Sequence, residues 1–146
     1  MATTPPVIRQ RFATAVDAIA GMSEARNPYD SFGNSPNTVA HLRFSVGILS
    51  VQAQPDDRQR QQQGFLAETA IGVKFSFRLK PKAQLTSYDD AYLKAGSLIQ
   101  SLTNRTPTVY TDTQIRFEAI AHELSSANEY MIMILTFNVL HYVPLT

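Results

Sequence analysis

Two stretches of the chain place apolar residues three or four positions apart, which is the spacing of one face of an amphipathic helix. The first stretch follows Pro5 and Pro6, which suit a first helical turn because the N–H that proline lacks has no partner there. The apolar positions of this predicted helix are Ile8, Phe12, Ala15, Ile19 and Met22.

The second predicted helix begins near Thr86 or Ser87, since an aspartate follows each of them three residues later. A hydroxyl at the N-cap and carboxylates in the first turn stabilise the positive end of a helix. We expect this helix to end at Leu102, because the segment from Asn104 to Pro107 contains a residue that breaks helices. Its apolar stripe consists of Tyr88, Ala91, Tyr92, Ala95, Leu98, Ile99 and Leu102.

Four other stretches alternate apolar and polar residues with the period of a strand that buries one face. They span residues 38–52, 65–80, 114–122 and 130–143. The third stretch, in which Ile115, Phe117, Ala119 and Ala121 share a side, also permits a helix. The fourth is apolar on both sides, with Met131, Met133, Leu135, Phe137 and Val139 on one of them. A strand that is apolar on both faces is normally covered on both.

The predicted order is therefore helix, strand, strand, helix, strand, strand, and it indicates an α+β fold. The first two strands are expected to form an antiparallel hairpin, because neighbouring strands joined by one connection usually pair. Two helices can cover one face of the resulting antiparallel or mixed four-stranded sheet. We expect a single domain over residues 1–146, with residues 1–6 as an N-terminal extension. Residues 27–37, which contain Tyr29 and Phe32, are predicted to be a loop.

The connection between the first two strands, residues 53–64, is longer than most hairpin loops. It contains Arg58, Arg60 and Gln62, whose long polar side chains can bind carboxylates, phosphates or backbone carbonyls. One interpretation is an arm, from Asp57 to Gln63, that reaches a partner subunit or passing DNA. The alternative is a solvated tip with no partner.

The sheet face away from the helices is expected to carry both charged and apolar side chains. The charged side chains of Arg43, Lys74 and Arg78 are readily hydrated. Exposure to water is unfavourable for the apolar side chains of Ile132, Ile134 and Leu140. An apolar patch with a charged rim commonly marks a protein–protein contact. We therefore predict a subunit or partner interface here. In the alternative, the last strand is central and the long loops fold over it.

Composition limits the chemistry that the chain can perform. The absence of cysteine excludes disulfides, zinc–thiolate sites and a cysteine nucleophile. His41, His122 and His141 lie in different segments and lack metal-binding spacings. No nucleotide-binding or nucleophile motif occurs, so we expect no enzyme activity, metal or cofactor. The net charge of +1 does not favour a general DNA-binding protein. No signal peptide or membrane-spanning stretch is recognisable, which predicts synthesis and folding in the cytoplasm.

The order of elements resembles that of tail-terminator proteins of long-tailed phages. These proteins share an N-terminal amphipathic helix, a β-hairpin with a long connection, a second helix and a final pair of strands. The segment Tyr130 to Val139 is similar to their closing strand, and the chain length is similar too. The resemblance spans nearly the whole chain but involves no short motif.

The resemblance implies a structural virion protein that forms a homo-hexameric ring, caps the tail tube and joins the head. Its partners would be copies of itself, the tail tube protein and a head-completion or neck protein, with DNA passing through the lumen. Neither catalysis nor a cofactor is implied. Other neck or tail-completion proteins, such as a head-side adaptor, and a generic oligomeric α+β binding module remain alternatives.

Overall fold

Helices and strands follow one another in the expected order, with one short strand added. The computed structural model describes residues 4–25, 41–53, 64–109, 113–124 and 129–144. Its elements are α1 (Pro5–Asp17), β1 (Ser23–Glu24), β2 (Arg43–Ala53), β3 (Gly64–Arg78), α2 (Gln84–Val109), β4 (Gln114–Leu124) and β5 (Tyr130–Pro144). The predicted loop at 27–37 and residues 54–63 of the predicted arm lie outside the described residues.

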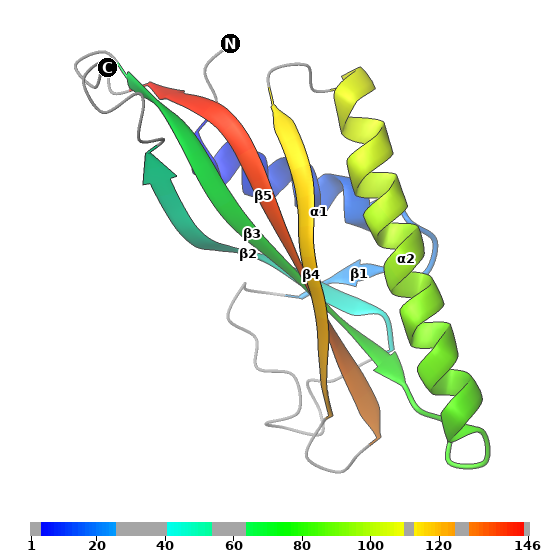
Figure 1. Cartoon of the computed structure of the whole chain (residues 1–146). Helices are drawn as coiled ribbons and strands as arrows, with labels where there is room; N and C mark the ends of the chain where they lie inside the picture. Colours follow the sequence, from blue (N-terminus) through cyan, green and yellow to red (C-terminus); the bar gives the residue numbers. More distant parts are fainter. Residues whose placement is uncertain (1–3, 26–40, 54–63, 110–112, 125–128, 145–146) are drawn as a thin grey trace.

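The strands form a mixed five-stranded sheet in the order β1-β2-β3-β5-β4 (Figure 1). The predicted β2–β3 hairpin is confirmed as antiparallel, and β5 pairs antiparallel with both β3 and β4. The expected four strands were one too few, because β1 pairs parallel with the start of β2. A strand of two residues shows no alternation, so no pattern could reveal it.

Strands β3 and β5 form the centre of the sheet and pair over their whole length, from Gly64 opposite Pro144 to Arg78 opposite Tyr130. Because β5 lies between β3 and β4, the backbone groups on both of its edges pair with a neighbouring strand. The position of β5 between two strands agrees with the alternative interpretation, in which the last strand is central.

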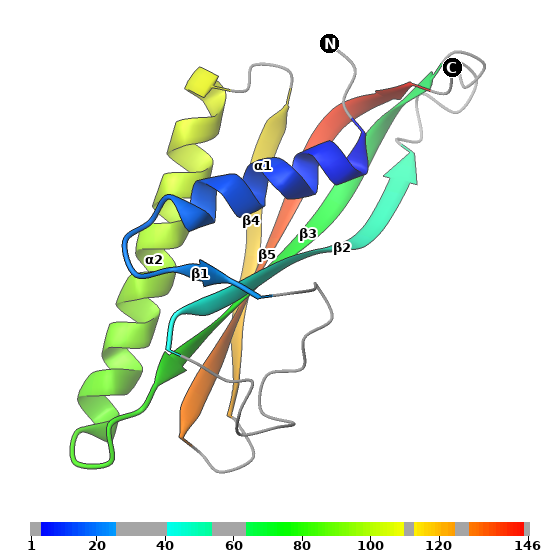
Figure 2. The same cartoon turned by 180° about the vertical axis from the view of Figure 1, so that it is seen from behind.

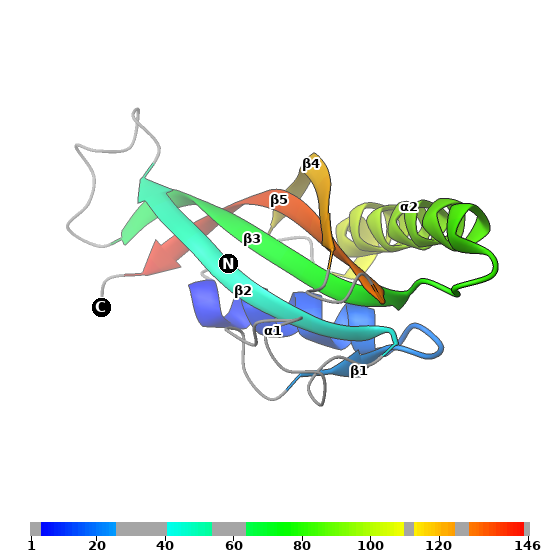
Figure 3. The ribbon, with the colours of Figure 1, turned by 90° about the horizontal axis from the view of Figure 1, so that it is seen from below.

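Both helices pack on the same face of the sheet (Figure 2), as the sequence predicts. Figure 3 shows α1 below the central strands and α2 beside β4. Phe137 of β5 packs against α1 and β4, with its ring centroid 5.4 Å from that of Phe12 and 5.7 Å from that of Phe117. The helices contribute mainly Ile8, Phe12, Ala13, Val16, Ala91, Ala95, Leu98 and Leu102 to the buried core.

Helix α1 ends at Asp17, earlier than the apolar spacing predicts. Ile19 and Met22 still pack against the core, but they do so from a turn that leads into β1. Gly21 in this turn has a φ of +86°, a left-handed conformation that glycine adopts without steric cost. The spacing thus identified the buried positions but placed the helix end too late.

Helix α2 starts before the predicted N-terminal signature and continues beyond its predicted end. Ser87 lies inside the helix, where its hydroxyl donates to the carbonyl of Ala83 at 2.8 Å. The same oxygen accepts the backbone N–H of Lys80 at 3.2 Å, so it fastens the preceding turn to the first turn of the helix. The expected break at Asn104 to Pro107 is wrong, since the helix runs to Val109. A proline this close to a helix end disturbs only the last turns of a helix that is already formed.

The third predicted strand is confirmed as β4, but a bulge changes which side chains share a face. The register shifts between Phe117 and Ala119, which adds one residue and reverses the alternation. Consequently Ile120 packs against the core with Phe117, whereas the predicted positions Ala119 and Ala121 face away. A second bulge interrupts β2 between Ile48 and Ser50.

Candidate interaction surface

Neither of the two described helices packs on the other face of the sheet, which is turned toward the viewer in Figure 1. We call it the open face. The register places the side chains of Lys74 and Ile134 next to each other on it, and those of Glu68 and Leu140 further along the same two strands. Polar and apolar groups therefore alternate across this surface.

Ile132 lies on the open face but is only 3% exposed. The prediction that it presents an apolar surface to a partner is therefore wrong for this residue. Its neighbours across the sheet are Ser76 of β3, which is fully buried, and Glu123 of β4. Ile134 and Leu140 are half-buried, so they retain accessible surface that a partner could cover.

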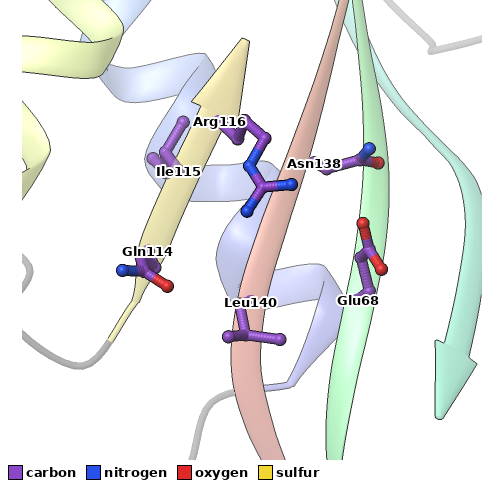
Figure 4. Close-up of a pocket in the computed structure, with 6 residues that line it drawn as sticks. All are labelled: Glu68, Gln114, Ile115, Arg116, Asn138 and Leu140. Atoms are coloured by element: carbon purple, nitrogen blue, oxygen red, sulfur yellow. The ribbon is translucent and has the colours of Figure 1, made fainter. Parts of the chain in front are cut away.

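A shallow hollow of about 310 Å³ surrounds Leu140 on the open face. Figure 4 shows the Arg116 guanidinium reaching across β5 toward Asn138, with the carboxylate of Glu68 beyond it. The amide of Asn138 donates to the carboxylate of Glu118 at 2.7 Å. The bulge in β4 supplies Glu118 as the extra residue. The lining residues are Glu68, Gln114, Ile115, Arg116, Asn138 and Leu140.

This hollow offers a carboxylate, a guanidinium and amide groups around a leucine side chain. Such a mixture can bind the polar backbone and the apolar side chains of another protein at the same time. The hollow therefore combines groups that can contact both the polar and the apolar parts of a partner.

The three predicted basic residues are spread along the open face rather than gathered. Lys74 is exposed beside Ile134. Arg43 is half-buried at the start of β2, where its carbonyl accepts the Ser76 hydroxyl at 3.4 Å. Arg78 is exposed at the end of β3, far along the strand from Glu68, which pairs with Leu140 of β5. The remaining predicted contacts, Arg58, Arg60 and Gln62, lie outside the described residues.

A second hollow, of about 470 Å³, lies between the end of β3 and the start of α2. The backbone N–H of Arg78 donates to Nδ1 of His41 at 3.1 Å, and the His41 ring meets the edge of Phe77 at a centroid distance of 4.8 Å. Burial lowers the pKa of His41 below its usual value of 6.5, and the nearby charges of Arg78, Lys80 and Lys94 lower it further. These surroundings favour the neutral imidazole over the protonated one.

The other two histidines serve separate local contacts. Nδ1 of His122 lies 2.7 Å from the hydroxyl of Tyr92, which joins β4 to α2. Burial raises the pKa of Tyr92, and the neighbouring Tyr88 raises it further. His141 is buried beside Thr69. Among the residues that the structure describes, no group of three or more His, Cys, Asp or Glu side chains is placed to hold a metal ion.

Sequence reasoning missed Glu68, and it missed the role of Gly72. The alternation that places Lys74 on the open face also places Glu68 there when it is followed back along β3, so the signal was present. A Cβ atom at Gly72 would lie 3.2 Å from the side chain of Leu49. The glycine therefore makes room for the bulged residue of β2 to pack over the sheet.

Comparison with protein-family models gives no match, and a search of curated proteins finds no matching relative. No helix in the described part of the chain is long and apolar enough to cross a membrane. The functional assignment therefore depends on the residues and the fold themselves.

Proposed function

We propose that this chain is a structural protein that binds other proteins through the open face of its sheet. We further propose that it forms the ring that terminates the tail tube of a long-tailed phage. One observation supports the first proposal. On the sheet face that neither described helix covers, half-buried Ile134 and Leu140 lie among charged Lys74 and Arg116. A combination of apolar and charged side chains is typical of the surfaces through which proteins bind one another.

The phage assignment has narrower support, which is the resemblance in the order of elements. An α+β subunit with two helices on one face and a long connection after β2 agrees with that resemblance. In this role the chain would assemble as a homo-hexamer in the virion. It would contact the tail tube protein on one side and a head-completion or neck protein on the other.

The oligomeric state of the purified chain tests this proposal most directly. Light scattering after gel filtration should give the mass of a hexamer, and the protein should cap purified tail tubes and prevent further growth. A head-side adaptor would not stop the growth of isolated tubes, which separates these two functions. A chain that stays monomeric at high concentration and does not bind tube ends would refute the terminator role.

A charge reversal tests the open face itself. Lys74→Glu changes an exposed residue beside Ile134, so it should leave folding intact and weaken binding to the tube end or to neighbouring subunits. Lys82→Glu is the matched control, because Lys82 is also exposed but lies in the turn before α2. Equal behaviour of the two variants in assembly and in capping would show that this face makes no contact.

A further inference from the structure

The second hollow, of about 470 Å³, lies where β3 leads into α2. Figure 1 shows β3 passing through a short turn directly into α2, which brings side chains of both elements to one place. Its volume lies within the range of pockets that hold ligands. The residues that line it are His41, Phe77, Arg78, Lys80, Ala83, Thr86, Ser87 and Asp90.

Positive charge is concentrated around this hollow. Arg78 and Lys80 line it, and both are exposed. Burial lowers the pKa of His41 most, and the charges of Arg78, Lys80 and Lys94 each lower it further. These three charges therefore make the potential at the ring positive. Among the described lining residues, Asp90 is the one carboxylate.

The hydrogen bonds around the hollow leave particular donors for a ligand. Because Nδ1 of His41 accepts the backbone N–H of Arg78 at 3.1 Å, the proton of the neutral ring lies on Nε2, which can donate to a bound oxygen. The hydroxyl of Ser87 is already engaged within the turn. Thr86 is exposed in the first turn of α2, at the positive end of the helix, and its hydroxyl can donate as well.

An apolar surface lies beside these donors. The ring of Phe77 meets that of His41 at a centroid distance of 4.8 Å, and Ala83 adds a methyl group. A bare phosphate ion would leave this apolar surface uncovered. A nucleic acid, with its closely spaced phosphates, would bring several negative charges near Asp90. The lining therefore matches a segment of protein that carries a carboxylate next to an apolar side chain.

We propose that the hollow at the start of α2 binds an acidic and apolar segment of a protein partner. The carboxylate of the segment accepts a hydrogen bond from His41 and is attracted by Arg78 and Lys80, and its apolar side chain packs on Phe77. The inference goes beyond the proposed function, because this hollow lies far along β3 from the one around Leu140 and requires no ring.

Peptide titrations followed by NMR of the His41 ring test the proposal. The probes are a short blocked peptide that alternates glutamate with leucine, the same peptide with glutamine in place of glutamate, and inorganic phosphate. The glutamate peptide should raise the pKa of His41, because its carboxylates offset the surrounding positive charge. The glutamine peptide should bind about fivefold or more weakly, since it has no charge to place beside the two exposed cations.

Substitutions around the hollow separate its charges from those nearby. Arg78→Gln combined with Lys80→Gln should weaken binding of the glutamate peptide about fivefold or more. Lys82→Gln is the matched control, because Lys82 is exposed in the same turn but does not line the hollow, and it should bind as the unchanged chain does. Asp90→Asn removes a repulsive charge and should strengthen binding about twofold. Circular dichroism checks that each variant is folded.

Three results would overturn the proposal. Equal binding of the two peptides would show that charge plays no part. Equal binding by the double variant and by Lys82→Gln would place the contact elsewhere. If inorganic phosphate shifts the His41 signals as strongly as the glutamate peptide does at the same concentration, the hollow is a site for small anions and not for a protein segment. These measurements do not depend on oligomeric state, so their failure would leave the proposed ring standing.

Discussion

The Nε2 atom of His141 lies 2.6 Å from the hydroxyl oxygen of Thr69, and both side chains are buried on the face that the helices cover. The two residues lie on β5 and β3, diagonally across the central strand pair. They place a polar contact inside an otherwise apolar core, where a hydrogen bond is costly to lose.

Replacing Thr69 with valine should therefore destabilise the fold. The substitution keeps the shape of the side chain and removes the hydroxyl, so we expect the free energy of unfolding to fall by about 1–3 kcal/mol. Urea unfolding followed by circular dichroism measures the change. Thr136→Val, at a half-buried position on the open face, is the matched control and should change the stability less. Equal effects would mean that the His141 contact contributes nothing.

Phe137 should be among the residues most important for the core, since its ring contacts Phe12 of α1 and Phe117 of β4. Phe137→Ala leaves a cavity between the helix and two strands, and we expect a loss of about 3–5 kcal/mol. Leu85→Ala provides the comparison, because Leu85 is 76% exposed and its truncation should change the stability by no more than about 0.5 kcal/mol. A small loss at Phe137 would contradict the packing described above.

The sequence predicted those parts of the fold in which local pattern and tertiary environment agree. The strands β3 and β5 could be recognised because their apolar residues recur over long stretches, but no local pattern predicted that the two would pair with each other. The β4 faces could not be predicted, because one bulged residue, Glu118, reverses the alternation without changing the kinds of residue present.

The candidate surface was predicted less completely than the fold. Alternation placed Lys74, Ile134 and Leu140 on the correct face, but it could not show that Ile132 is buried there. Burial of this kind depends on which side chains approach across the sheet, and pairing of β3 with β5 is a long-range contact. The exposure of Ile48 was likewise not predicted, because the alternating pattern of its strand assigns Ile48 to the core.

Ser87 should stabilise the start of α2 more than Thr86 does. Its hydroxyl contacts both Lys80 and Ala83, whereas Thr86 is exposed. We expect Ser87→Ala to cost about 1 kcal/mol in the free energy of unfolding, and Thr86→Ala to cost little. Thermal unfolding of the two variants decides between them. A larger loss of stability for Thr86→Ala than for Ser87→Ala would instead support a helix that begins near Thr86, as the sequence predicts.

His41 should make the stability of the protein depend on pH in the weakly acidic range. Its pKa in the fold is lowered, so below pH 6.5 the unfolded chain binds a proton more readily than the folded chain does. The stabilising contribution is complete above pH 6.5 and is lost as the pH falls through the lowered pKa of the folded state. Protonation at Nδ1 would also remove the acceptor for the Arg78 N–H.

NMR titration of the His41 ring and urea unfolding at several pH values measure this effect. His41→Asn removes the titrating group, so the difference in stability between the two proteins should shrink as the pH falls below 6.5. A His41 pKa at or above 6.5 in the folded protein would contradict the prediction.

The position of β5 in the middle of the sheet has a consequence for biosynthesis. Every other strand and both helices leave the ribosome before Tyr130, yet β3 and β4 cannot be joined until β5 arrives between them. During that interval one edge of β3 and one edge of β4 have no partner strand, and unpaired strand edges are prone to mispairing in a crowded cell. Completion of the sheet therefore waits for β5, and slow translation through the β5 codons would prolong the period in which the sheet is incomplete.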